Sequence, residues 1–184
     1  FNLYRPETAA EAVKLKASDA TSRYLAGGTD MIVNVRRGIE TPETMIDLTA
    51  IAEITAISVG EGDLQIGAGV KLAKLATDEN ILRDYPAVAQ AAASVAGPTH
   101  RSYGTIGGNL CLDTRCLFYN QSQWWRQSNN FCLKHKGEIC HVAPGGKRCF
   151  AAFSGDVAPA MIVYGAQADL EGPGGVRTVA LADI

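Results

Sequence analysis

Residues 22–38 read SRYLAGGTDMIVNVRRG, and this stretch decides the fold class. Ser22 to Ala26 has the composition of a short strand, which Gly27-Gly28 would end. Asp30 to Arg37 then has helical spacing of its apolar residues and stops at Gly38, a residue that suits the C′ position of a helix. A strand that turns through two glycines into a helix predicts an α/β protein.

The flanking residues continue this pattern. Thr8 to Glu11 is a capping box, which predicts a helix through about Ala17. Met45 to Leu48 predicts a second strand, and the order strand, loop, helix, strand favours parallel pairing through a right-handed crossover. Ile54 to Val70 is apolar sequence interrupted by glycines, Gly62 among them, which predicts short strands and tight turns.

Further along, Lys71 to Ala76 and about Pro86 to Val95 are expected to be helical, and Gly97-Pro98 is expected to stop the second helix. Met161 to Leu170 and Val176 to Leu181 predict a closing hairpin that turns at residues 172–175.

Composition limits the function classes. A chain of 184 residues, 47% hydrophobic and 20% charged, fits one domain or two small lobes. The net charge of -2 gives no global case for nucleic acid or an anionic membrane, and no run of about 18 apolar residues predicts a membrane span. No secretory signal is evident, so a cytoplasmic location is expected. The chain starts without Met and ends at no obvious stopping point, which suggests a trimmed or partial chain.

Two glycine turns are candidate ligand sites. Ala26-Gly27-Gly28-Thr29-Asp30 follows a predicted strand, so its backbone N–H groups could bind a pyrophosphate, although such a turn is also a common structural device. It is neither a G-x-G-x-x-G motif nor a P-loop, which disfavours a Rossmann or nucleoside-triphosphate site. Thr105-Ile106-Gly107-Gly108-Asn109 is a second turn of this kind, and the two could serve the two ends of one dinucleotide.

All five cysteines lie between Cys111 and Cys149. An odd count without an export signal argues against a disulfide framework, and buried free thiols are the plain alternative. Residues 112–152 show no periodicity but hold both tryptophans, and residues 113–149 carry six Lys or Arg against two acids. So long a segment without pattern is functional or disordered in most proteins, and its Trp, Phe and Cys content argues against disorder.

The thiols allow two metal sites. With Cys111 set aside because it adjoins the glycine motif, the four that remain match the ligand number of a [4Fe–4S] cluster: Cys116, Cys132, Cys140 and Cys149. Cys111 lies only five positions before Cys116 and is the alternative first ligand. The rival is zinc bound by Cys132, Cys140 and Cys149 together with either His135 or His141. Gaps without C-x-x-C are atypical of both kinds of site, so the residues alone leave the choice open.

Three motifs in this order resemble the FAD-binding subunits of the xanthine oxidase family of molybdenum enzymes: residues 26–30, Arg101 with residues 105–109, and Gly155-Asp156-Val157-Ala158-Pro159. The resemblance implies the fold shared with vanillyl-alcohol oxidase, with FAD between an N-terminal lobe (1–52) and a larger lobe (53–184). Residues 26–30 would wrap the pyrophosphate, residues 105–109 would contact the flavin side and phosphates, and Asp156 would bond the cofactor. The C-terminal domain of the family is expected to be absent.

The 112–152 segment departs from ordinary members and resembles the cluster-bearing insertion of the 4-hydroxybenzoyl-CoA reductase branch. That resemblance favours a [4Fe–4S] cluster over zinc. It implies reductive dehydroxylation of 4-hydroxybenzoyl-CoA in a hetero-oligomer with a molybdopterin-binding subunit, a [2Fe–2S] subunit and ferredoxin as donor. We further expect the insertion's basic residues to help dock an acidic ferredoxin: Arg126, Lys134, Lys136, Lys147 and Arg148. An oxidative enzyme of the xanthine or CO dehydrogenase kind and a zinc-stapled non-catalytic module are the alternatives.

Overall fold

The computed structural model describes residues 1–60 and 63–184, so Gly62 lies outside the described residues. It divides the chain into two compact units. The first comprises Phe1–Thr29, Pro42–Cys111 and Gly155–Ile184, and the second comprises Asp30–Thr41 with Leu112–Ser154. The second unit covers the predicted insertion at 112–152. The predicted lobe boundary after residue 52 falls inside the first unit and stays a prediction.

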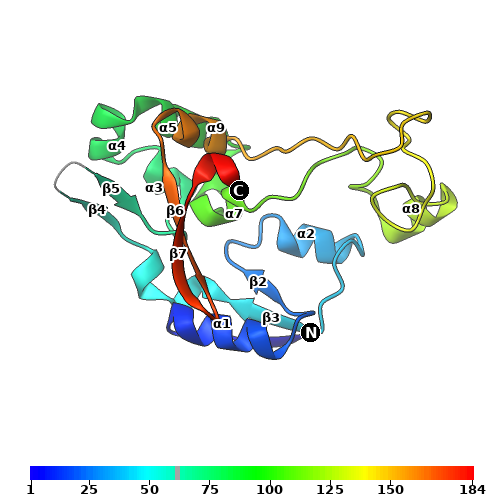
Figure 1. Cartoon of the computed structure of the whole chain (residues 1–184), viewed down its shortest axis with the longest axis horizontal. Coiled ribbons are helices and arrows are strands. Elements are labelled where there is room, and N and C mark those ends of the chain that lie inside the picture. Colours follow the sequence, from blue (N-terminus) through cyan, green and yellow to red (C-terminus); the bar gives the residue numbers. More distant parts are fainter. Residues whose placement is uncertain (61–62) are drawn as a thin grey trace. The chain divides into compact units, whose positions relative to one another are not determined.

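A small parallel sheet with one helix beside it begins the first unit (Figure 1). Its strands lie in the order β1-β3-β2, and both pairings are parallel, which confirms the predicted parallel pairing. The elements are β1 (Asn2–Tyr4), α1 (Ala9–Ser18), β2 (Arg23–Leu25) and β3 (Thr44–Asp47). The three-residue β1 was not predicted, because its short sequence has no alternating pattern.

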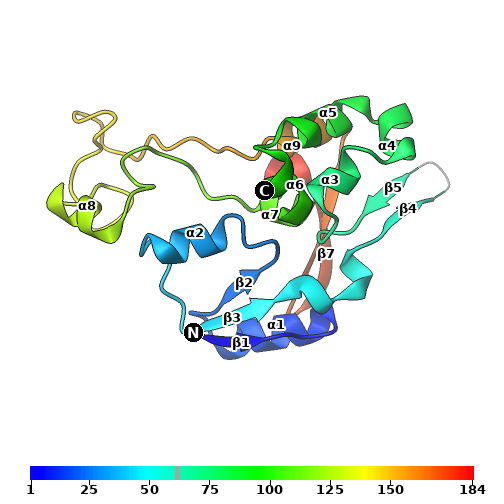
Figure 2. The ribbon, with the colours of Figure 1, turned by 180° about the vertical axis from the view of Figure 1, so that it is seen from behind.

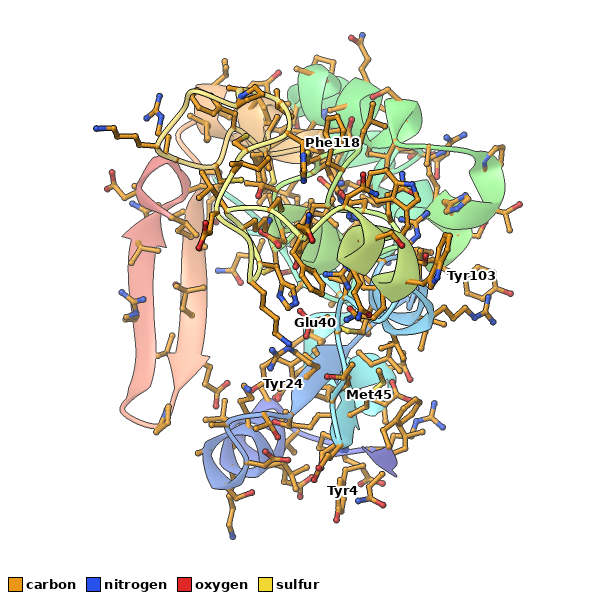
Figure 3. The ribbon with its side chains drawn as sticks, turned by 90° about the vertical axis from the view of Figure 1, so that its right-hand side faces the viewer. Tyr4, Tyr24, Glu40, Met45, Tyr103 and Phe118 are labelled. Atoms are coloured by element: carbon orange, nitrogen blue, oxygen red, sulfur yellow. The ribbon has the colours of Figure 1, made fainter. Side chains whose placement is uncertain are left out.

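The predicted capping box at the start of α1 is half formed. Thr8 Oγ1 accepts a hydrogen bond from the Glu11 N–H at 3.2 Å, whereas the Glu11 carboxylate accepts from Glu7 N–H rather than from Thr8. Ala12 on α1 packs with Ile46 and Ile51 in a small apolar cluster. Met45 on β3, labelled in Figure 3, is fully buried. Burying side chains of this size stabilises the fold by roughly 1.5–3 kcal/mol each.

The rest of the first unit is a helical group with two hairpins, and most of its apolar core lies here. Val70, Leu75, Ile81, Val88 and Ile106 are among the buried residues of this core. The predicted strands at 54–70 and the helices near 71–76 and 86–95 are confirmed. The helical and 3-10 elements are η1 (Leu48–Ala50), η2 (Ala52–Ile54), α3 (Leu72–Leu75), α4 (Glu79–Asp84), α5 (Pro86–Ser94), α6 (Pro98–Tyr103), α7 (Ile106–Leu110), α9 (Val157–Val163) and η3 (Leu181–Asp183). The hairpins are β4 (Ile57–Val59) with β5 (Leu64–Ile66), and β6 (Gln167–Gly172) with β7 (Gly175–Ala180).

Two expectations need correction. Residues 161–166 were expected to form a strand, but Met161 lies in α9, and the closing hairpin begins only at Gln167. An apolar run of this length fits a helix as well as a strand, and the periodicity could not decide between them. Gly97-Pro98 does follow the end of α5, but Pro98 also begins α6 at the first helical position, where its missing N–H costs nothing.

The second unit holds two helices joined to irregular chain, seen from the other side in Figure 2. They are α2 (Met31–Arg36) and α8 (Gln123–Ser128). Gly38 has φ of 66°, as expected of the residue that ends α2. Arg115 and Ala152 form a β-bridge that closes the base of the insertion. Within the described ranges, no helix has the length and apolarity needed to cross a bilayer.

Candidate functional site

The first glycine motif forms the turn after β2, with Ala26 to Thr29 in the first unit. Gly27 lies directly against the chain at Tyr103, because a Cβ atom at Gly27 would be 2.0 Å from the Tyr103 carbonyl oxygen. The Tyr103 side chain itself projects outward and is 61% exposed (Figure 3). Gly28 has φ of 72°, a left-handed conformation that glycine adopts without strain. The backbone path therefore requires both glycines.

This turn also presents free hydrogen-bond donors. Across residues 1–60 and 63–184, the structure gives no acceptor to the backbone N–H groups of Gly27, Gly28 and Thr29. Backbone N–H groups are nearly always paired when buried, and a concave run of unpaired ones binds anions. The turn has the donor set that a pyrophosphate needs.

In the second motif, Thr105 to Asn109, several backbone N–H groups are engaged in hydrogen bonds within the protein. The N–H groups of Ile106 and Gly107 donate to carbonyls of residues 68–70, each at 2.9 Å. The N–H of Gly108 donates to Thr105 Oγ1 at 3.1 Å and so caps α7. These three donors are therefore occupied, and a ligand contact from this motif would have to come from the exposed Gly108 surface or from other groups.

The remaining first-unit candidates differ in what they contact. Asn109 is buried, and its Oδ1 accepts from the Val157 N–H at 3.1 Å, which joins the second motif to the third. Arg101 Nη1 donates to the carbonyls of residues 95–96 at 2.8 and 2.7 Å. Asp156 is exposed and makes no capping bond to α9. Of these three, Asp156 has the side chain most open to a ligand.

Asp30 belongs to the second unit and is held there by its neighbours. Its carboxylate forms an ion pair with Arg115 and accepts a hydrogen bond from Asn34 Nδ2 at 3.0 Å. Arg115 directly precedes Cys116, the first predicted metal ligand. No local pattern predicted this ion pair, which joins Asp30 to the base of the insertion.

Four of the five cysteines line a single pocket in the second unit. The pocket has about 280 Å³ of empty space, part of it open to solvent, and its lining includes Cys116, Cys132, Cys140 and Cys149. All five cysteines are free, and Cys111 belongs to the first unit and does not line this pocket. The chain therefore brings together the four thiols that the sequence selected, over a separation of 33 residues between the first and the last.

Backbone donors surround two of these sulfur atoms. Hydrogen bonding from the Ala143 N–H, with further N–H groups of Val142 and Phe150, lowers the pKa of the Cys140 thiol although burial opposes the shift. The Ala151 N–H donates to Cys149 Sγ at 3.4 Å. Such bonds favour the thiolate, which is the form that binds metals.

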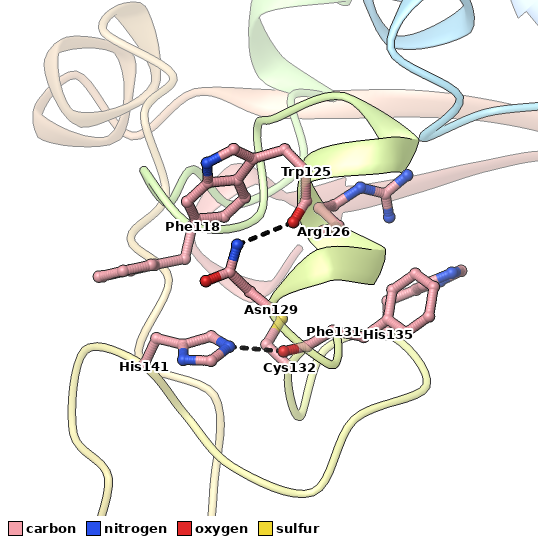
Figure 4. Close-up of a pocket in the computed structure, with 8 residues that line it drawn as sticks. All are labelled: Phe118, Trp125, Arg126, Asn129, Phe131, Cys132, His135 and His141. Carbon is pink, nitrogen blue, oxygen red and sulfur yellow. Dashed lines mark hydrogen bonds between the residues drawn. The ribbon is translucent and has the colours of Figure 1, made fainter.

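The histidines take other positions (Figure 4). His141 Nε2 is 2.6 Å from the Phe131 carbonyl oxygen, and the His135 ring meets the Phe131 ring edge-on at 5.5 Å. His141 reaches the cysteine pocket and His135 does not. Among the described residues, no three His, Cys, Asp or Glu side chains are grouped as a single metal ion requires. The present arrangement therefore gives no support to a one-ion zinc site.

Two basic residues that were expected to help dock a ferredoxin, Arg126 and Lys134, are not free surface charges, and this expectation was wrong for the buried Arg126. Arg126 is only 2% exposed, and its Cζ lies 5.5 Å from the centroid of the Tyr119 ring. Lys134 Nζ lies 4.7 Å from the same ring and 2.7 Å from Asp113 Oδ2. Tyr119 and Lys134 both line the cysteine pocket. Arginine and lysine are exposed in most proteins, so the sequence offered no signal for this placement.

Comparison with known proteins identifies the family. The family described as FAD binding domain in molybdopterin dehydrogenase matches residues 1–184. The chain belongs to this family. The unpaired N–H groups of the first glycine turn fit its cofactor, since FAD contains a pyrophosphate.

Individual relatives agree with this assignment. The aldehyde oxidoreductase FAD-binding subunit PaoB of Escherichia coli strain K12 is 31% identical over 189 residues, which covers 100% of this chain and 59% of that protein. The xanthine dehydrogenase FAD-binding subunit of Escherichia coli O157:H7 is 35% identical over 109 residues, or 59% of this chain and 37% of that protein. The chain thus spans only part of the length of each relative.

Solved structures show the same fold. The reconstituted CO dehydrogenase from Oligotropha carboxidovorans matches with a TM-score of 0.73 and 26% identity, over 100% of this chain and 51% of that one. The predicted mixed α/β FAD-binding fold is therefore confirmed.

Proposed function

We propose that this FAD-binding domain carries both FAD and a [4Fe–4S] cluster, and serves electron transfer in a molybdenum enzyme that reductively dehydroxylates 4-hydroxybenzoyl-CoA to benzoyl-CoA. The observation that carries the proposal is the convergence of four cysteines on one pocket. A cluster of four irons takes one thiolate per iron, so its ligands stand farther apart than those of a single ion. The four thiols that line this shared space could supply those ligands.

The residues of the first unit that would hold FAD belong to its glycine turns and to the start of α9. The free N–H groups of Gly27, Gly28 and Thr29 would bind the pyrophosphate, and the Gly108 surface and Asp156 would offer further contacts. The buried Asn109 and the carbonyl-bound Arg101 would position the loops that carry them. Bound FAD would supply a redox centre that accepts electrons singly or in pairs.

The cluster would be held by Cys116, Cys132, Cys140 and Cys149. The hydrogen bonds to the sulfur of Cys140 are of the kind that tunes iron–sulfur potentials. Cys111, in the other unit, is the natural control residue.

The relatives are named as FAD-binding subunits, which supports a multi-subunit assembly. We propose a hetero-oligomer with a molybdopterin-binding subunit and a [2Fe–2S] subunit, reduced by ferredoxin during anaerobic aromatic degradation. The exposed basic residues of the insertion, Lys136, Lys147 and Arg148, suit an acidic donor.

A test compares the wild-type enzyme with Cys132→Ser and Cys111→Ser, all purified without oxygen. We expect reduced wild type and Cys111→Ser to give the electron paramagnetic resonance signal of a [4Fe–4S] cluster, and Cys132→Ser to lose it. Equal spectra in all three enzymes would refute the cysteine assignment.

A second candidate, an oxidative hydroxylase, is favoured by the xanthine and CO dehydrogenase relatives. The electron donor separates the two. Reduced ferredoxin should drive benzoyl-CoA formation if the proposal holds, whereas hydroxylation coupled to NAD reduction would favour the oxidative enzyme.

A further inference from the structure

Arg126 is a buried cation that forms no ion pair with any carboxylate of residues 1–60 and 63–184. On α8 it is 2% exposed, and its Nη2 donates to the Gly38 carbonyl at 2.7 Å and to Gln123 Oε1 at 2.9 Å. Its Nε and Nη1 have no hydrogen-bond partner in the part of the chain that the structure describes, and no carboxylate there forms an ion pair with it. The guanidinium is thus half satisfied, by neutral groups alone.

A buried guanidinium without an opposite charge destabilises the folded protein. Removing a charge from water costs several kcal/mol even after relaxation, and burial without an opposite charge leaves that cost uncompensated. Lys134 shows the usual solution, since its ammonium pairs with Asp113. Arg126 therefore calls for a negative group close by.

The four-cysteine pocket adjoins this cation and could supply negative charge to it. Arg126 and Cys132 line one small cavity, shown in Figure 4, and Cys132 also lines the four-cysteine pocket. Tyr119 contacts both features. Its ring centroid lies 5.5 Å from the Arg126 guanidinium, and Tyr119 also lines the cysteine pocket. Four thiolates bound to an iron–sulfur cluster would give this pocket net negative charge.

We infer that Arg126 is a positioning residue that supplies the counter-charge of the thiolate-bound cluster and raises its reduction potential. This rests on the proposed function of the cysteine pocket. A nearby fixed cation stabilises the more negative, reduced form of a cluster, and net charge is one of the factors that set its potential. The same attraction would favour retention of the cluster.

The experiment uses the assembled enzyme with Arg126→Gln, Arg126→Lys and, as control, Arg148→Gln. Arg148 is exposed and adjoins Cys149, so solvent screens its charge. Redox titration followed by electron paramagnetic resonance should give a more negative midpoint potential for Arg126→Gln, a smaller shift for Arg126→Lys and little change for Arg148→Gln. Iron content should fall most in Arg126→Gln.

The outcomes separate the inference from the function on which it rests. A wild-type enzyme without a cluster would refute the proposed function. A wild-type cluster whose potential is the same in Arg126→Gln would overturn only the role of Arg126, as would equal shifts in Arg126→Gln and Arg126→Lys. If Arg126→Gln retains no cluster, retention by Arg126→Lys supports the charge requirement, and loss from both variants overturns it.

Discussion

Replacing Gly27 with alanine tests whether the first glycine turn is shaped for close approach. The new Cβ would lie 2.0 Å from the Tyr103 carbonyl oxygen and 2.5 Å from its carbonyl carbon, and backbone atoms cannot swing aside as a side chain does. The turn must therefore shift, and overpacking of this kind costs about 1–3 kcal/mol. If the shift displaces the free N–H groups, FAD affinity should fall about 5- to 150-fold, at about 1.4 kcal/mol per factor of ten.

The measurement is a fluorescence titration of the deflavinated enzyme with FAD, with flavin content of the purified enzyme as a second reading. Gly172→Ala is the matched control, because a Cβ atom there would meet nothing within 4 Å. We expect the control to bind FAD like the wild type. Wild-type affinity in Gly27→Ala, with unchanged thermal stability, would refute the close-packing argument.

Three further predictions concern stability. Met45→Ala should lower the free energy of unfolding by about 2–5 kcal/mol, because it opens a cavity at a fully buried site, and a denaturant titration that shows no loss would contradict this. Hydrogen bonding, first from the Thr21 side chain, lowers the pKa of Asp19, so its stabilising contribution is present above its unfolded pKa and is lost as pH falls through the folded value. Asp19→Asn should therefore be less stable than wild type at neutral pH and equal to it in acid, as thermal melts at both pH values can check. Arg115→Ala breaks a part-buried ion pair with Asp30 and should cost about 1 kcal/mol, read as faster hydrogen exchange in α2; unchanged exchange would count against the link.

Local signals in the sequence predicted the elements that depend on local chemistry. Thr8 marked the start of α1, and Gly38 marked the end of α2, because caps and left-handed glycines act within one turn of a helix. The prediction of a strand at residues 161–166 was wrong. Helix α9 begins at Val157, whose N–H donates a hydrogen bond to the distant Asn109, and no local sequence pattern indicates that contact.

At the cysteine pocket, too, some features could be predicted from the sequence and others depend on tertiary contacts. The choice of four thiols followed from their number and crowding, and those four line one pocket. The surrounding charges could not be predicted, because Arg126 is buried only through tertiary contacts with residues such as Gly38. Asp30 stays a predicted cofactor residue, and its ion pair with Arg115 could not be predicted because the two residues are 85 positions apart in the chain.

The most direct test of the account is the metal and sulfide content of the enzyme. Iron, acid-labile sulfide and zinc are measured in wild type, Cys140→Ser and Cys111→Ser, all purified anaerobically with their partner subunits. The account predicts that Cys140→Ser loses the iron and sulfide of one [4Fe–4S] cluster per chain, whereas Cys111→Ser keeps both. Iron that is unchanged in Cys140→Ser, or zinc that is lost from it in place of iron, would contradict the central claim.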